Sequence, residues 1–176
     1  KRSVPTASTH DGKSVVDGKS TAKSVVSSEL KGYPGHYWFG AYWSPWDFPQ
    51  FGTEATATNS YGFYWHADQM IFQEAPGSDQ GLTLWSAFVL SPQQNIAKLP
   101  FQANGGAIYK GLIPSRDDDI TGFGIVYGKF SSDYARTVSD TGGGSPDYEM
   151  VFEWNYKIQV NRFVFVQPNI QWVVNP

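Results

Sequence analysis

The sequence of 176 residues contains no cysteine, so structural disulfides and Cys-ligated zinc sites are excluded. It contains no run of 18 apolar residues, and this excludes a transmembrane helix. A net charge of −3 leaves no basic footprint, so nucleic acid is not expected as a partner. The length corresponds to about one domain, and its fold must be predicted from the pattern of apolar residues.

Aromatic residues are abundant, at 16% of the chain including seven Trp, whereas charged residues make up only 16%. From residue 35 onward apolar side chains recur at every second position, which predicts strands rather than helices. Gly and Pro separate the strands, and no amphipathic helix of useful length is expected. We therefore predict an all-β, antiparallel up-and-down fold with strands at about 35–43, 60–74, 81–91, 102–112, 120–131, 147–159 and 163–174.

Residues 1–34 differ from the rest of the chain, because they are rich in Ser, Thr, Lys and Gly and have few aromatic residues. We expect a polar loop here, with room for one strand near residues 22–31. The strand-rich part, residues 35–176, is expected to hold the fold.

The last thirty residues predict a hairpin with two different faces. Apolar residues occupy even positions in both arms, and opposed residues of an antiparallel pair sum to a constant. The turn must then hold an odd number of residues, and we predict Val160–Arg162 with Asn161 in a left-handed conformation. The apolar pairs that follow are Ile158 with Val164, Tyr156 with Val166, Phe152 with Ile170 and Met150 with Trp172. The polar pairs are Asn155 with Gln167 and Glu153 with Asn169.

Strand length favours lipid as the partner of the apolar face. Eleven residues tilted by about 45° rise roughly 25 Å, the height of the apolar band of an outer-membrane barrel. Long connections at 44–59 and 132–146 alternate with short ones at 75–80, 113–119 and 160–162, and residues 92–101 are intermediate. Long and short connections therefore fall at opposite ends, as in such barrels. The alternative is a soluble β-domain whose second layer covers the apolar face.

Two local features predict irregularities. Gly122, Gly124 and Gly128 share one face of their strand, which leaves room for an inward-folded loop or a solute, or for close packing of a neighbouring side chain. Pro168 lies within the last strand and lacks an N–H, so a bulge or an unpaired site is expected there.

Three segments together resemble the C-terminal half of the OprB-type carbohydrate-selective porins. They are YGFYWHADQMIFQE (61–74), GGAIYKGLIPSRDDDITGFGIVYGKFS (105–131) and DYEMVFEWNYKIQVNRFVFVQPNIQWVVNP (147–176). The matching pieces occur in the family's order. They are Ala67-Asp68-Gln69-Met70, Gly111-Leu112-Ile113-Pro114 with Arg116 and Asp118, Tyr148-Glu149 with Glu153 and Tyr156, and Gln167-Pro168 with Gln171 and Asn175-Pro176.

The resemblance implies a sixteen-stranded transmembrane β-barrel through which sugars diffuse across the outer membrane. Seven or eight strands are too few to enclose water, so we expect a fragment that lacks the N-terminal half and the last strand. The partners implied are outer-membrane lipid, carbohydrate solutes and, as an open alternative, further copies in a trimer. No cofactor is implied.

A passive channel needs hydrogen-bonding side chains on its wall and no catalytic residue. Parity assigns seven candidates for the pore lining, with simple solvation of the interior as the alternative role. They are Glu149, Glu153, Asn155, Lys157, Gln167, Asn169 and Gln171.

Neither a catalytic site nor a metal site is predicted. His66 and Asp68 share a strand face, but no third partner completes a triad. Glu149 and Glu153 lie about 13 Å apart along their strand, too far for a glycosidase pair. The three histidines have no metal-ligand spacing. In SRDDD (115–119) we expect a solvated turn in which Arg116 pairs with Asp118, with an ion site as the alternative; the histidines are His10, His36 and His66.

The predicted function is that of a porin for sugars and small solutes. The alternative is a soluble carbohydrate-binding β-sandwich, which tryptophans and amide side chains would serve equally well. An outer-membrane enzyme has only scattered polar residues in its support. A porin requires detergent for extraction, whereas a soluble module does not.

Overall fold

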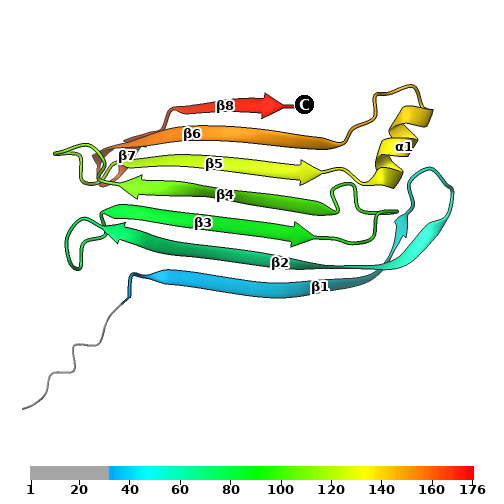
Figure 1. Ribbon diagram of the computed structural model, residues 1–176, viewed down its shortest axis with the longest axis horizontal. Coiled ribbons are helices and arrows are strands. Elements are labelled where there is room, and N and C mark those ends of the chain that lie inside the picture. Colours follow the sequence, from blue (N-terminus) through cyan, green and yellow to red (C-terminus); the bar gives the residue numbers. More distant parts are fainter. Residues whose placement is uncertain (1–31) are drawn as a thin grey trace, which may run out of the picture. The chain divides into compact units, whose positions relative to one another are not determined.

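The computed structural model describes residues 32–176, which form one antiparallel sheet and a short helix (Figure 1). Strands adjacent in sequence are adjacent in the sheet from β1 to β6, and β7 and β8 both pair with β6. This up-and-down order confirms the predicted all-β antiparallel class. The elements are β1 (Gly35–Pro49), β2 (Thr56–Gln73), β3 (Gly81–Leu90), β4 (Phe101–Lys110), β5 (Ile120–Lys129), α1 (Ser132–Asp140), β6 (Tyr148–Asn161), β7 (Val164–Val166) and β8 (Asn169–Val174).

The last predicted strand is present as two pieces, because Pro168 interrupts it. β7 ends at Val166 and β8 begins at Asn169. The N–H of Tyr156 still donates to the Pro168 carbonyl at 3.2 Å, whereas the proline has no N–H to return. The irregularity expected at Pro168 is therefore found. The strand expected near residues 22–31 lies outside the described residues.

The predicted long connection at 44–59 is wrong. β1 continues to Pro49 and β2 begins at Thr56, so only residues 50–55 connect them. A register shift between Ser44 and Asp47 breaks the alternation of β1, which hides its continuation in the sequence. One end of the sheet, here called the helix rim, carries connections 50–55, 91–100 and 130–147; the opposite end, the turn rim, carries 74–80, 111–119 and 162–163 (Figure 1). The asymmetry is weaker than predicted and rests mainly on residues 130–147.

The helix α1 was not expected, since residues 132–146 were predicted to be loop. Ser131 caps its N-terminus by accepting a hydrogen bond from the Tyr134 N–H at 2.9 Å. The Tyr134 ring packs against Phe51 and Phe130, with centroids 5.3 and 5.7 Å away. Nine residues are too few for a helical pattern to stand out in the sequence, and such a short helix depends on tertiary contacts. None of the described helical structure is long and apolar enough to cross a membrane.

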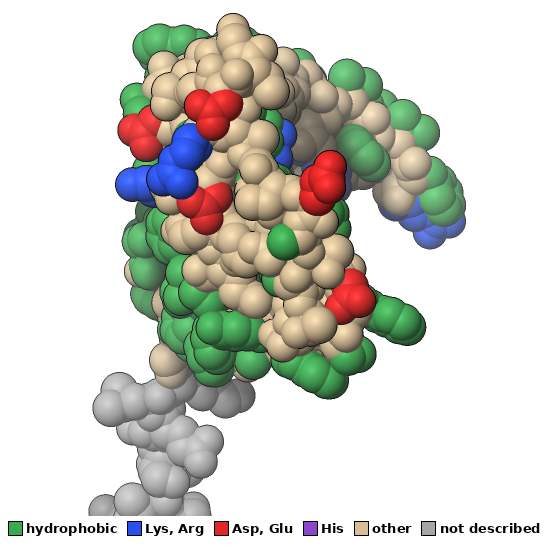
Figure 2. Space-filling model, turned by 90° about the vertical axis from the view of Figure 1, so that its right-hand side faces the viewer, with side chains coloured by type: hydrophobic (Ala, Val, Ile, Leu, Met, Phe, Trp, Pro, Cys, Tyr) green, Lys and Arg blue, Asp and Glu red, His purple; other side chains and the backbone are tan. Residues whose placement is uncertain are grey.

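The two faces of the sheet differ in chemistry. The outer face, defined as the face that carries Trp154, bears rings with much of their surface exposed: Phe39 at 69%, Trp154 at 47% and Trp172 at 70%. Within residues 32–176 the buried apolar side chains are Ala67, Met70 and the ring of Pro100. In Figure 2, which looks along the strands, hydrophobic side chains lie along the outer margin of the curved sheet. The described residues therefore place no second layer over these rings.

The predicted register of the final hairpin is wrong by two residues. Phe152 pairs with Trp172 rather than with Ile170, although the parity, and hence both faces, are as expected. The turn holds residues 162 and 163, and a register shift lies between Gln159 and Asn161. The Asn161 side chain causes the difference, because its Oδ1 accepts the N–H groups of residues 163 and 164 at 2.9 and 3.1 Å. Asn161 is not left-handed.

Candidate functional site

The inner face, opposite the exposed rings, carries the seven predicted pore-lining residues. Glu149, Glu153, Asn155 and Lys157 are on β6, and Asn169 and Gln171 are on β8. Their odd positions put them opposite Trp154 in direction, because successive side chains of a strand alternate. Gln167 lies in the break between β7 and β8 and reaches the same groove as Glu153. The shared face agrees with the parity argument, whereas contact with a solute stays a prediction.

A hydrogen-bonded cluster joins three of these residues. The Glu153 carboxylate accepts from Gln171 Nε2 at 2.7 Å and from Asn155 Nδ2 at 3.3 Å. The opposed polar pairs are Glu153 with Gln171 and Asn155 with Asn169, which corrects the predicted partners by the same two residues as on the outer face. The amides hold the carboxylate in place and leave its charge uncompensated, because they contribute no positive charge.

Lys157 is held by an aromatic ring instead of a carboxylate. Its Nζ lies 4.7 Å from the centroid of Phe165, and both residues are on the inner face. Alternation along the strand places Phe165 on the inner face, but only polar side chains were sought there in the sequence, so Phe165 was not singled out. This contact keeps the ammonium group at the turn rim.

Glycines of β4 and β5 leave a strip of the inner face without side chains of its own, beside the cluster. The Trp85 indole lies over Gly124, where an added Cβ would be 3.5 Å from Cζ2, and over Gly106. Asn155 covers Gly122 in the same way, at 3.0 Å from its Oδ1.

Gly128 faces Leu99 of connection 91–100, whose Cδ2 would lie 3.3 Å from an added Cβ. Close packing of a side chain is therefore observed at all three glycines, and at Gly128 that side chain comes from a loop. Sequence reasoning missed Trp85, since the strand pairing that brings it there is not visible in its own strand.

The inner face is mixed rather than uniformly polar. Val151 and Val173 oppose each other within the β6–β8 ladder, and Ile108 and Val126 are exposed on β4 and β5. Apolar side chains are thus interspersed with the carboxylates and amides. A uniformly hydrated wall is not what the structure presents.

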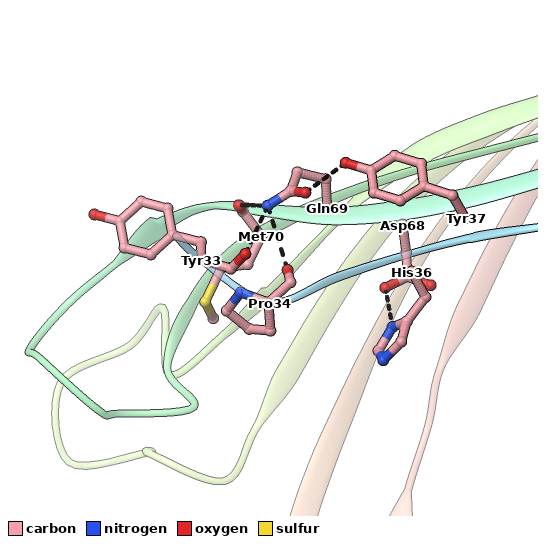
Figure 3. Close-up of polar contacts among 7 residues, drawn as sticks. All are labelled: Tyr33, Pro34, His36, Tyr37, Asp68, Gln69 and Met70. Carbon is pink, nitrogen blue, oxygen red and sulfur yellow. Dashed lines mark hydrogen bonds and ion pairs between the residues drawn. The ribbon is translucent and has the colours of Figure 1, made fainter. Parts of the chain in front are cut away.

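The start of β1 is fastened to β2 on both faces (Figure 3). On the inner face His36 Nδ1 lies 2.9 Å from Asp68 Oδ2. On the outer face the Tyr37 hydroxyl donates to Gln69 Oε1 at 2.5 Å, and Gln69 Nε2 donates to backbone carbonyls, that of Met70 at 2.7 Å among them. His66 and Asp68 share the inner face as predicted, with the Trp38 ring 4.8 Å from the His66 ring. His36 is tied to a carboxylate and forms no catalytic triad.

The charged turn at residues 115–119 is closed by a different ion pair from the predicted one. Arg116 binds Asp119 with two hydrogen bonds, whereas Asp118 lies 3.8 Å from Lys110. Asp119 immediately precedes β5 and is therefore fixed by the sheet, while the Asp118 side chain is exposed. Lys110 also pairs with Asp79 of the neighbouring turn. No group of His, Asp and Glu within residues 32–176 is arranged to hold a metal ion.

A single antiparallel layer with bare aromatic rings on one face and hydrogen-bonding groups on the other is typical of proteins that span a membrane with β-strands around a water-filled channel. The chain belongs to the family described as "Carbohydrate-selective porin, OprB family", whose sequence profile matches residues 6–176. Members are outer-membrane porins rather than enzymes. The predicted family, location and non-enzymatic class are thereby confirmed.

A solved structure shows the same fold. The high-pH structure of Pseudomonas putida OprB matches with a TM-score of 0.74 and 22% sequence identity, over 82% of this chain and 40% of that chain. The chain thus spans less than half the length of the protein that it matches, and the sheet corresponds to part of an OprB barrel. Comparison with curated protein sequences gives no significant match.

Proposed function

We propose that residues 35–176 form the C-terminal portion of the wall of a barrel through which sugars diffuse across the outer membrane. The opposed chemistry of the two faces carries this proposal. Trp154 and Trp172 present exposed rings on the outer face, where lipid would cover them, and Glu153 and Gln171 form a polar cluster on the inner face. The remaining strands of the barrel would then be supplied by other parts of the full-length protein.

The seven inner-face residues are proposed to line the channel. Carboxylate, amide and ammonium groups can exchange hydrogen bonds with the hydroxyl groups of a sugar as it sheds part of its water. The solute class is proposed from the carbohydrate selectivity in the family's description together with this lining. Association into a trimer stays a prediction, to be tested by cross-linking of the full-length protein in detergent.

The alternative function, that of a soluble carbohydrate-binding β-sandwich, does not fit the exposure of the aromatic rings. Such a fold would bury Phe39 and Trp154 beneath a second layer, and within residues 32–176 both remain exposed. Extraction discriminates between the two functions. The porin leaves the membrane fraction only with detergent, whereas recovery in plain buffer would favour the sandwich.

Liposome swelling with the full-length protein tests the channel function. Liposomes that contain the protein should swell in isotonic glucose, since the sugar enters and water follows. Protein-free liposomes and liposomes with an unrelated outer-membrane protein that has no open pore serve as controls. Swelling no faster than in these controls would overturn the proposal.

A further inference from the structure

Four side chains of β1 and β2 form a compact group on the inner face near the turn rim, here called the histidine quartet. His36 and Trp38 share one face of β1, and they pair directly with Asp68 and His66 of β2. Figure 3 shows the corner of the quartet in which the His36 ring meets the Asp68 carboxylate. The quartet contains none of the seven predicted pore-lining residues and is a separate feature of the wall.

The Trp38 ring contacts both imidazoles. Its centroid lies 5.6 Å from that of His36, with the two rings stacked, and 4.8 Å from that of His66. Indole faces attract cations, so these contacts are compatible with protonated imidazoles. The His36 side chain is 65% exposed, so ions in the water on this face can approach the quartet.

The quartet reverses the sign of its charge when both imidazoles take up protons. Histidine is the residue type that ordinarily gains its charge between about pH 8 and pH 5. The Asp68 carboxylate lies 2.9 Å from His36, whereas His66 forms no ion pair with a carboxylate of the described residues. Protonation of both imidazoles therefore takes the quartet from one net negative charge to one net positive charge.

The strands beside the quartet add no further charge to it. The residues of β3 opposite Asp68 and His66 are Trp85 and Ala87, and neither is ionisable. The next titratable side chain on the inner face of β2 is Tyr64, and phenols ordinarily ionise only in alkali. Within residues 32–176, β1 has no strand on its other side. The two imidazoles and one carboxylate thus decide the local charge.

We infer that the histidine quartet is a proton-dependent anion site of the channel wall. With both imidazoles protonated it attracts small anions, and with both neutral its carboxylate repels them. Imidazolium N–H groups also donate hydrogen bonds to chloride or to a carboxylate. The inference rests on the proposed channel function and goes beyond it, because it concerns charged solutes rather than sugars.

The reversal potential of single channels tests the inference on the full-length protein, in planar bilayers across a gradient of potassium chloride. The permeability ratio of chloride to potassium should rise as the pH is lowered from about 8 to about 5. Each charge gained should raise the ratio by roughly two- to fourfold, the effect of a unit charge about 5 Å from an ion at about 0.1 M salt. A ratio that stays constant over this range would overturn the inference.

Substitutions assign the pH dependence to the quartet. His36→Gln and His66→Gln keep a polar side chain that gains no charge, so each should remove part of the rise and the double variant most of it. Lys157→Gln is the matched control, since it removes an inner-face charge outside the quartet. It should lower the ratio by the same factor at both pH values, because amines ordinarily stay charged throughout this range. An undiminished rise in the double variant would refute the assignment.

The two levels fail in different ways. Glucose-dependent swelling with pH-independent ion selectivity leaves the channel function standing and removes the anion site. Absence of swelling removes both. Should the double variant form no channels, the two single variants decide the question, and His36→Gln changes a largely exposed side chain.

Discussion

The Asp119 carboxylate accepts two hydrogen bonds from the Arg116 guanidinium, at 2.8 and 2.9 Å. The Asp119 side chain is only 3% exposed. The Tyr156 hydroxyl donates to it at 2.6 Å and the Gln159 N–H at 2.8 Å. The turn 111–119 is thus bound to β6 at the turn rim. The Arg116 guanidinium is the main cause that lowers the pKa of Asp119 to about 2 from 3.8.

This pKa predicts an acid-dependent loss of stability. A carboxyl group whose pKa is lower in the folded chain stabilises the fold above its ordinary pKa, and this contribution disappears as the pH falls from about 4 through about 2. Asp119→Asn should lower the unfolding temperature at neutral pH and flatten its decline in acid. Thermal unfolding of the full-length protein in detergent, followed by circular dichroism, measures both. Asp118→Asn is the control and should change little; an equal effect of the two variants would contradict the prediction.

A charge on the outer face should cost more than one on the inner face. Phe152→Arg is expected to lose roughly 2–4 kcal/mol, because it places a cation near the middle of the apolar band. Asn155→Arg lies on the inner face, which we propose lines the channel, so the protein should fold and its single-channel conductance should change. Folding yield in lipid vesicles and conductance in bilayers give the two readouts. Similar tolerance at both positions would argue against the assignment of faces.

Two neighbouring glycines should differ in their tolerance of alanine. At Gly106 an added Cβ would clash with the carbonyl oxygen of Phe123, so the β4–β5 pairing must shift, at a cost of roughly 1–3 kcal/mol. At Gly124 the nearest atom is Trp85 Cζ2 at 3.5 Å, an ordinary contact. Chemical unfolding in detergent should show Gly106→Ala as clearly less stable and Gly124→Ala as near wild type. The reverse order would show that the strands pack otherwise.

The connections of the helix rim should loosen together when Tyr134 is removed. The Tyr134 ring lies against Phe51, and the Phe51 N–H donates to the Asn95 carbonyl oxygen at 2.9 Å. Connection 50–55, connection 91–100 and α1 therefore stabilise one another. In Tyr134→Ala the amides of residues 50–55 should exchange hydrogen faster in mass spectrometry. Arg136→Ala removes only an exposed side chain and is the control. Protection that persists at 50–55 in Tyr134→Ala would disprove the coupling.

The sequence was informative wherever a property depends on alternation alone. The faces of Phe152 and Glu153 follow from parity. The interruption of the last strand at Pro168 is predictable because proline lacks an N–H. Local chemistry that competes with alternation was not visible. The side-chain acceptor of Asn161 closes a shorter turn than parity suggested and displaces every pair of the hairpin by two residues.

Contacts between distant strands account for the rest. Trp85 gains its place over Gly124 through the pairing of three strands, and no single strand encodes that geometry. Likewise Arg116 could reach either of two aspartates in an isolated turn. The anchoring of Asp119 by Tyr156, 37 residues later, decides between them.

The near absence of buried apolar side chains, limited in the described residues to Ala67, Met70 and Pro100, has a thermodynamic consequence. A water-soluble domain gains most of its folding free energy by withdrawing apolar surface into its own interior. If lipid covers the outer face as we propose, the corresponding gain for this sheet comes from the surrounding hydrocarbon, and its stability depends on the thickness and packing of the bilayer. We therefore expect the strand order to be adopted and the lipid to be entered in a single transition, without a stable folded state in water.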